Sequence, residues 1–419
     1  MSMAMLATPA RRRGRDTEHM TMGAVPERAL TASARSVLAH VVTHGPTTRP
    51  TLAAALGLSK PTVSLAVADL ERAGLLECTH TTQGPTGRIA AVYALSATSG
   101  YVLGVDLGVT RIRVRASRMD GTVLLERERT RRSTARPRLR TMAAAGATHV
   151  RTVTAAVGNA HGPLRGIGVA VPYSVLRSGA PSTGRSAELD SEQAVTNALR
   201  SAGVSPAVPI HVENNVNCAA LAEQHEGSAR GVETFAVLQV GVGIGLGLVV
   251  AGRLFAGANG VAGEASLVPF PWAPGEVPRH EALEEYLGSE GLMSRVRSAW
   301  PPQLGPAPAD AESLFDLAAR STAPGAGTAR RLVDEHATEV GRLATAVAAL
   351  LDPGLIVLGG GVGSNPLLLE GVQRVLDGLP WRTRVVTSDL GSAATLIGAN
   401  RLAGASAVSA LLDGTVPVV

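Results

Sequence analysis

Apolar side chains recur at helical spacing in three short segments near the N-terminus. The first segment covers residues 31–44 and the second covers 47–55, and each fits one short helix. Gly57 makes the turn into a third helix, for which Ser59 is a good N-cap and which ends before Gly74. Two short helices joined by a tight turn, the second with a polar N-terminus, are typical of a helix-turn-helix.

A strand-like run follows these helices, and the glycine-rich segment QGPTGR at 83–88 separates it from a second strand-like run. Two strands around such a tip are typical of a wing, so residues 27–96 are predicted to form a winged helix-turn-helix domain. Residues 1–26 contain an arginine cluster and no apolar period, which predicts a disordered tail. The alternative is an arm that contacts DNA phosphates.

From residue 101 onward, strand-like and helix-like segments alternate and are separated by glycine-rich turns, which predicts an α/β fold. The expected strands lie at 101–117 (two runs with a tight turn between them), 166–172, 209–213, 235–257 (a hairpin) and 355–360, and the expected helices at 141–157, 191–202 and 328–351.

The predicted third helix presents polar side chains in its first turns. Lys60 can reach guanine or phosphate, Leu65 can contact a thymine methyl group, and Arg88 at the wing tip can enter a minor groove. The predicted DNA-contacting residues are Ser59, Lys60, Thr62, Ser64, Leu65 and Arg88. The alternative is a small helical packing module whose polar face is solvated.

The composition limits the class of protein and its compartment, but it does not indicate a specific function. Hydrophobic residues make up 45% and charged residues 17%, as in ordinary soluble proteins, and the net charge of +5 is compatible with nucleic acid. Cys78 and Cys218 give no disulfide framework, so a reducing cytoplasm is expected. The N-terminus lacks a signal peptide, and the most apolar stretch, 238–251, is too short to cross a bilayer, so no membrane segment is expected.

Three glycine-rich turns occur in the order that a phosphate-binding two-lobed fold needs. DLGVT at 106–110 lies between two strand-like runs, and QVGVGIGLG at 239–247 and VLGGGVG at 357–363 follow. The expected turn residues are Asp106, Gly108, Thr110, Gly241, Gly243, Gly359 and Gly360. Further motifs are GLSKPTVSLAVADLERAGLL (57–76), VENNVNCAALAE (212–223) and GRLFAGANGVAGEAS (252–266).

With these motifs the chain resembles the ROK family (repressors, open reading frames and kinases). The resemblance implies an actin-like, ribonuclease H-like ATPase fold over 101–419, with lobes of approximately 101–208 and 209–419. The N-terminal winged helix implies the repressor branch, similar to the xylose and N-acetylglucosamine repressors. Asn214, Glu264 and Glu284 match the sugar-binding positions of the family.

Two positions depart from the kinases of the family. Asn215 replaces the Asp that serves as general base, so no residue is expected to be catalytic, since losing a positioned base costs on the order of 10²- to 10⁴-fold in rate. Val242 replaces the Thr of a phosphate-binding turn and removes a hydroxyl donor. Asn215 remains a candidate ligand-binding residue.

The zinc site of the family is also altered. Leu267 replaces a His that binds both zinc and sugar, and the segment 271–285, where the family has three Cys, contains none. His280 alone cannot supply the four ligands that zinc needs, so neither a metal nor a cofactor is expected. The altered sugar side leaves open whether the effector is a simple hexose.

We therefore expect a DNA-binding transcriptional regulator, a repressor, that a sugar or another small molecule controls from the interlobe cleft. Such proteins usually read pseudo-palindromic operators as two-fold dimers, so a homodimer or a dimer of dimers is expected. The rivals are an ATP-dependent sugar kinase and a ligand-independent DNA-binding protein. The arginines at 111, 113 and 115 alternate along one strand and are expected to be solvated or paired across the sheet, or to lie near DNA or an acidic partner.

Overall fold

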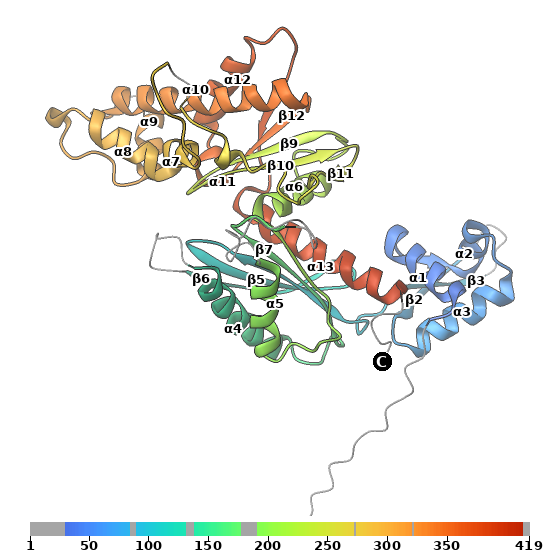
Figure 1. The fold of residues 1–419 in the computed structure, drawn as a ribbon. Coiled ribbons are helices and arrows are strands. Elements are labelled where there is room, and N and C mark those ends of the chain that lie inside the picture. Colours follow the sequence, from blue (N-terminus) through green and yellow to red (C-terminus); the bar gives the residue numbers. More distant parts are fainter. Residues whose placement is uncertain are drawn as a thin grey trace, which may run out of the picture.

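The computed structural model describes residues 30–83, 89–130, 138–176, 191–271, 274–320 and 322–413. A winged-helix unit and two α/β lobes follow one another along the chain (Figure 1). The winged-helix unit lies at the side of the first lobe, and the second lobe lies above the first in this view.

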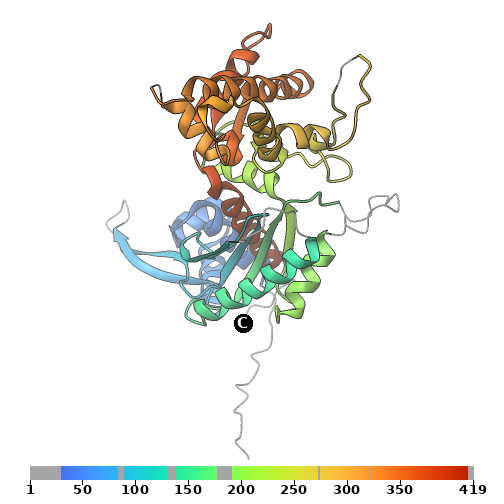
Figure 2. The same cartoon turned by 90° about the vertical axis from the view of Figure 1, so that its left-hand side faces the viewer.

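The winged-helix unit is built from helices α1 (Ala32–His44), α2 (Arg49–Leu56) and α3 (Lys60–Arg72), and strands β1 (Thr47–Thr48), β2 (Leu76–Gln83) and β3 (Ile89–Leu95). Thr31, Thr48 and Ser59 cap the three helices with their side chains. The second helix begins at 49 rather than 47, because Thr47 and Thr48 pair with β3. Strands β2 and β3 project from the body of the molecule as a ribbon (Figure 2).

The first lobe contains strands β4 (Tyr101–Leu107), β5 (Arg111–Arg118), β6 (Val123–Thr130), β7 (Leu164–Val171) and β8 (Ile210–Asn214), with helices α4 (Leu139–Val157) and α5 (Ser191–Ser201). The strand order is β6-β5-β4-β7-β8. Because β8 pairs with β7, the first lobe reaches residue 214, and the predicted division between 208 and 209 is corrected accordingly.

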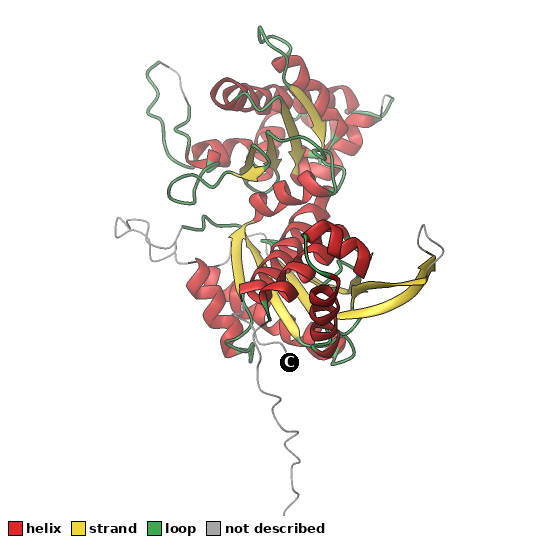
Figure 3. Cartoon of the chain, turned by 90° about the vertical axis from the view of Figure 1, so that its right-hand side faces the viewer, coloured by secondary structure: helices red, strands yellow, loops and turns green. Residues whose placement is uncertain are grey.

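The second lobe begins with α6 (Asn215–His225). Its sheet has the order β11-β10-β9-β12-β13, from β9 (Phe235–Val240), β10 (Ile244–Val250), β11 (Arg253–Leu254), β12 (Leu355–Gly359) and β13 (Arg384–Thr387). The helices are η1 (Ala265–Leu267), α7 (Ala282–Leu287), α8 (Ser289–Ala299), η2 (Pro302–Leu304), α9 (Ala311–Ala319), α10 (Ala326–Leu351), α11 (Gly360–Gly363), α12 (Pro366–Leu376) and η3 (Gly391–Ala393). Helices surround the strands of each lobe (Figure 3).

The last helix, α13 (Ala394–Asp413), lies between the sheet of the first lobe and α6. Glycines make this close packing possible. A Cβ added to Gly168 on β7 would lie 2.0 Å from the Ala399 carbonyl oxygen, and one on Gly398 would lie 1.8 Å from the Cys218 carbonyl oxygen on α6. Of the described helices, the segment Gly391–Asp413 is long and apolar enough to span a membrane, and this packing accounts for its composition.

The far end of α13 enters the core of the winged-helix unit. Leu411 is 2% exposed and belongs to the same hydrophobic cluster as Leu38 and Leu70. Arg35 on α1 donates from Nη1 to the Leu412 carbonyl oxygen at 3.0 Å. These contacts join the winged-helix unit to the helix that crosses the body of the protein.

The segment between β3 and β4 is also fixed. Glu77 accepts hydrogen bonds from the Ser96 hydroxyl at 3.0 Å and from the Ala97 amide at 3.2 Å. The buried Arg165 of β7 donates from Nε to the Ser99 carbonyl oxygen at 3.1 Å. The winged-helix unit is therefore held on the first lobe rather than attached by a free tether.

Candidate functional site

The first turn of α3 carries the residues predicted to contact DNA. The Ser59 hydroxyl caps the helix by accepting from the Thr62 amide at 3.3 Å, and the two hydroxyl oxygens lie 2.7 Å apart. Lys60 is exposed, and Ser64 is half-buried on the same helix. Leu65 is 63% exposed although it is a large apolar side chain. Arg88 lies outside the described residues.

A cleft of about 860 Å³ separates the two lobes. Eight places in the chain line it: the β4–β5 hairpin, the loop after β7, the start of α6, the β9–β10 hairpin, the loop leading into η1, the start of α7, α11, and the segment from η3 to the start of α13. The predicted residues that the cleft brings together are Asp106, Gly108, Thr110, Asn214, Asn215, Gly241, Gly243, Glu264, Glu284 and Gly360. Gly359, the last residue of β12, does not line it.

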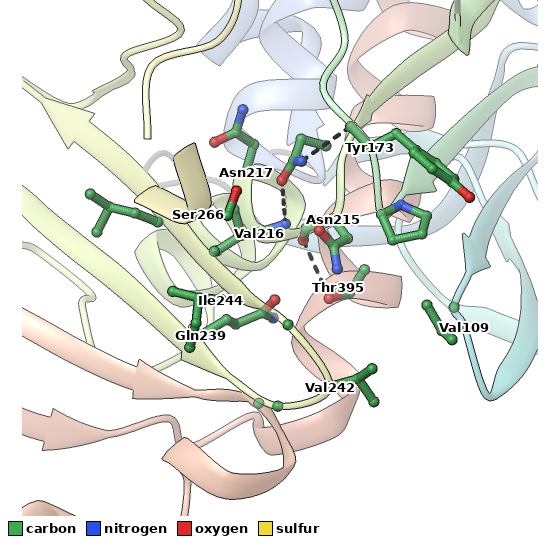
Figure 4. Close-up of a pocket in the computed structure, with 18 of the residues that line it drawn as sticks. Val109, Tyr173, Asn215, Val216, Asn217, Gln239, Val242, Ile244, Ser266 and Thr395 are labelled. Atoms are coloured by element: carbon green, nitrogen blue, oxygen red, sulfur yellow. Dashed lines mark hydrogen bonds between the residues drawn. The ribbon is translucent and has the colours of Figure 1, made fainter. Parts of the chain in front are cut away.

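On one side of the cleft, the β9–β10 turn presents backbone and an apolar side chain. Val242 is 53% exposed at the tip of this turn, and Figure 4 shows it well apart from Asn215. Glu284 on α7 lies against the turn, since a Cβ added to Gly243 would be 2.8 Å from a Glu284 carboxylate oxygen.

Asp106 at the end of β4 is paired inside the protein. Arg113 on β5 stands directly opposite it and donates to Oδ2 from Nε at 3.2 Å and from Nη2 at 2.7 Å. Each of the two residues is 6% exposed. Burial raises the pKa of the Asp106 carboxyl, while the positive charge of Arg113 opposes that shift.

The other side of the cleft carries Asn214 and Glu264, two of the residues that match sugar-binding positions, and both have partners within the protein. Asn214 caps α6 by accepting from the Val216 amide at 2.9 Å, and its Nδ2 donates to the Tyr173 carbonyl oxygen at 3.2 Å (Figure 4). Glu264 accepts from the Ser174 hydroxyl at 2.7 Å, which joins the two lobes across the cleft.

The start of α6 also touches α13. Thr395 on α13 donates from Oγ1 to the Asn215 carbonyl oxygen at 3.3 Å, beside the Asn215 side chain (Figure 4). Asn217, two residues further along α6, is 2% exposed and lines the cleft. Its Nδ2 donates to Glu213 at 3.0 Å, but its Oδ1 has no hydrogen-bond partner within the described part of the chain.

A family model described as the ROK family matches residues 102–406. The chain belongs to the ROK family. A second model, described as the MarR family, matches residues 30–84 and covers the winged-helix unit except its last strand. A ROK domain joined to a winged helix of this type supports a transcriptional regulator that binds DNA.

Curated ROK relatives include both regulators and enzymes. The Xylose repressor of Bacillus subtilis is 25% identical over 232 residues, which cover 54% of this chain and 58% of that protein. The Bifunctional enzyme NanE/NanK of Brucella suis is 32% identical over 206 residues, 49% of this chain and 36% of that protein. The chain thus spans less than two thirds of the length of these relatives.

A solved structure of a ROK family transcriptional regulator, a homologue of the E. coli MLC protein, has the same fold. It superposes with a TM-score of 0.66 and 18% identity, and the match covers 92% of this chain and 97% of that one. The predicted family and fold class are therefore confirmed: a winged helix-turn-helix followed by the two-lobed ROK domain.

The positions where this ROK domain departs from the kinase pattern lie in or beside the cleft. Asn215 and Val242 line it, as does Leu267, which is 45% exposed. The Nδ1 atom of His280 lies 3.1 Å from the Leu267 carbonyl oxygen. Among the described residues, no group of three or more His, Cys, Asp or Glu could hold a metal ion.

Sequence reasoning missed two residues of the ROK cleft. Arg113 was expected to belong to a basic strand face, and its neighbours do pair across the sheet, Arg115 with Glu126 at 2.9 Å and Arg111 with Glu128 at 4.0 Å. Arg113 also pairs across the sheet, with Asp106 on β4, and its place in the lining of the cleft is what the sequence did not indicate. Ser174 gave no signal, because its partner Glu264 is 90 residues away.

Proposed function

We propose that this protein is a ROK-type repressor that occupies a pseudo-palindromic operator through α3 as a homodimer or a dimer of dimers, in the cytoplasm. Lys60, Ser64 and Leu65 are assigned to base and phosphate contacts. Ser59 and Thr62 set the helix start and face the same groove. The exposed Leu65 supports this assignment, because a large apolar side chain on a polar helix face is expected where a partner covers it.

We further propose that a sugar or another small molecule in the cleft controls DNA binding. One observation carries this proposal: α13 begins in the cleft, where Thr395 contacts Asn215, and ends in the winged-helix core at Leu411. A change in lobe closure would therefore reach the DNA-binding helices through one continuous helix. A ligand produces this effect only if it binds the open and closed states with different affinities.

Asn214, Asn215, Glu264 and Glu284 are the proposed ligand contacts. The Oδ1 of Asn217, which has no hydrogen-bond partner among the residues that the structure describes, supports a polar ligand, since a buried acceptor without a donor costs about 1–3 kcal/mol that a ligand hydroxyl would recover.

Phosphoryl transfer is the second candidate, because curated relatives include kinases. We propose that it has been lost, since an amide at Asn215 cannot accept the proton of a sugar hydroxyl. A coupled assay with ATP over common sugars tests this, and clear turnover would refute the assignment as a regulator alone.

The decisive experiment is a footprint on the region upstream of the protein's own gene, repeated with sugars and sugar phosphates. A protected palindrome that one ligand releases supports the whole proposal. Protection that no ligand changes, together with no ligand-dependent change in thermal stability, would favour a ligand-independent DNA-binding protein. Absence of any specific protection at moderate salt would refute DNA-based regulation.

A further inference from the structure

The guanidinium of Arg113 occupies the phosphate side of the cleft as a fixed positive charge. It donates twice to Oδ2 of Asp106, the carboxylate of the DLGVT turn. A third hydrogen bond runs from Nη2 to the Ser392 carbonyl oxygen in η3, directly before α13. The guanidinium is thus held from two sides and cannot turn away from Asp106 without losing a buried contact.

A metal nucleotide needs a place for its cation in this cleft. Mg²⁺ binds to enzymes through one or two carboxylates together with the phosphates of the nucleotide. Asp106 is the carboxylate that the β4–β5 turn offers, and Arg113 already neutralises it. A divalent cation at that carboxylate would meet the positive charge of Arg113 at close range, where the low dielectric of a buried site makes repulsion strong.

The residues present therefore do not fit a metal nucleotide. The β9–β10 turn adds no hydroxyl, because Val242 stands at its tip. Glu284, another carboxylate of the cleft, belongs to α7 and lies against Gly243.

We propose that Arg113 takes the place of the divalent cation in this cleft, so that the cleft admits no metal nucleotide and its effector binds without a metal. The same side chain then serves a structural purpose, because it ties the former phosphate turn to the start of α13. The inference deepens the proposed function, since it concerns the effector cleft of the same regulator.

The test is the melting temperature of the full chain with MgCl₂ alone, with ATP and EDTA, and with ATP and MgCl₂. The wild type is expected to show no stabilisation that depends on Mg²⁺. Arg113→Ala leaves Asp106 buried and unpaired, so ATP with MgCl₂ should raise its melting temperature. At a nucleotide concentration about 100 times the Kd, the rise should be roughly 3 °C above that with ATP and EDTA.

Three further variants complete the design. Arg115→Ala is the matched control, because Arg115 lies on the same strand but pairs with the exposed Glu126, and it should gain no response. Adding Asp106→Asn to Arg113→Ala should abolish the gain. Arg113→Gln keeps a donor to Asp106 and removes only the charge, so it replaces Arg113→Ala if that variant does not fold.

Mg²⁺-dependent stabilisation of the wild type by ATP would overturn the inference, and this measurement stands even if no variant folds. Folded Arg113→Ala and Arg113→Gln proteins without any response to Mg²⁺ would overturn it as well. Operator binding by the wild type is measured in parallel. If the wild type binds the operator and also a metal nucleotide, the inference about Arg113 fails while the proposed function stands.

Discussion

The contact between α13 and α6 can be tested with two glycines on the same helix. A Cβ on Gly398 would lie 1.8 Å from the Cys218 carbonyl oxygen, whereas a Cβ on Gly404 would have no neighbour within 4 Å. Gly398→Ala requires the two helices to separate by more than 1 Å before the new atom reaches even 3.0 Å from that oxygen. Overpacking of this kind costs about 1–3 kcal/mol.

Gly404→Ala is the matched control, and it should change stability in the opposite direction. Alanine is favoured over glycine in a helix interior by about 0.5–1 kcal/mol, and nothing obstructs the added methyl group. Because the gain in helix propensity is common to both positions, the two variants should differ by the overpacking cost alone, about 1–3 kcal/mol in the free energy of unfolding. Urea titration of the full chain, followed by circular dichroism, measures this difference.

Operator affinity provides a second measurement on the same pair. Because the far end of α13 lies in the winged-helix core, a displaced α13 in Gly398→Ala should weaken operator binding, and Gly404→Ala should bind as the wild type does. If Gly398→Ala were as stable as Gly404→Ala, the close packing of α13 on α6 would be wrong, and the proposed coupling path would fall with it.

Three other predictions concern separate parts of the chain. Lys60→Ala should reduce the slope of log affinity against log salt by about one between about 50 and 200 mM salt, measured by fluorescence anisotropy on the operator, while Arg72→Ala at the opposite end of α3 should leave it unchanged; equal slopes would remove Lys60 from the interface. Burial, together with the charge of Arg295, lowers the pKa of His336 to about 3, so the folded protein keeps this ring neutral while the unfolded chain takes up a proton below the ordinary pKa of 6.5. The full stability is therefore present above about pH 7.5, where the ring is neutral in both states. About 2 kcal/mol of the free energy of unfolding should be lost between about pH 7.5 and pH 5 in urea titrations, a loss that His336→Gln should abolish. Asn215→Asp alone should leave the coupled kinase assay at background, because a base without a place for the metal nucleotide is insufficient; turnover in this variant would show that the missing base was the sole defect.

The sequence predicts most elements whose signals are local. The cap at Ser59 and the apolar stripe behind it locate α3 to within a residue or two, and the glycine-rich turns locate the β4–β5 and β9–β10 hairpins. Boundaries that depend on pairing between distant segments of the chain were not predicted correctly. The start of α2 differs from the predicted one because Thr47 and Thr48 pair with β3. The boundary between the lobes differs from the predicted one because β8 pairs with β7.

The residues of the site divide in the same way. The partner of Asp106 could have been derived, since an antiparallel hairpin around the 108–110 turn places residue 113 directly opposite residue 106. The bond between Ser174 and Glu264 could not, because two loops of different lobes bring them together. Neither could the passage of α13 to the winged-helix core, since both of its sides are buried against small residues and show no single apolar stripe.

Three of the cleft residues that match the family are engaged by the protein itself. Asp106 binds Arg113, Asn214 binds the Tyr173 carbonyl group, and Glu264 binds Ser174 across the lobes. A ligand that uses Glu264 must therefore replace the bond to Ser174, which is one of the contacts holding the lobes together. Recognition and lobe movement are then the same event, and affinity is reduced by the cost of breaking that contact. This arrangement would suit a sensor, because such a ligand would bind the two states of the cleft with different free energies, and α13 connects the start of α6 to the winged-helix unit.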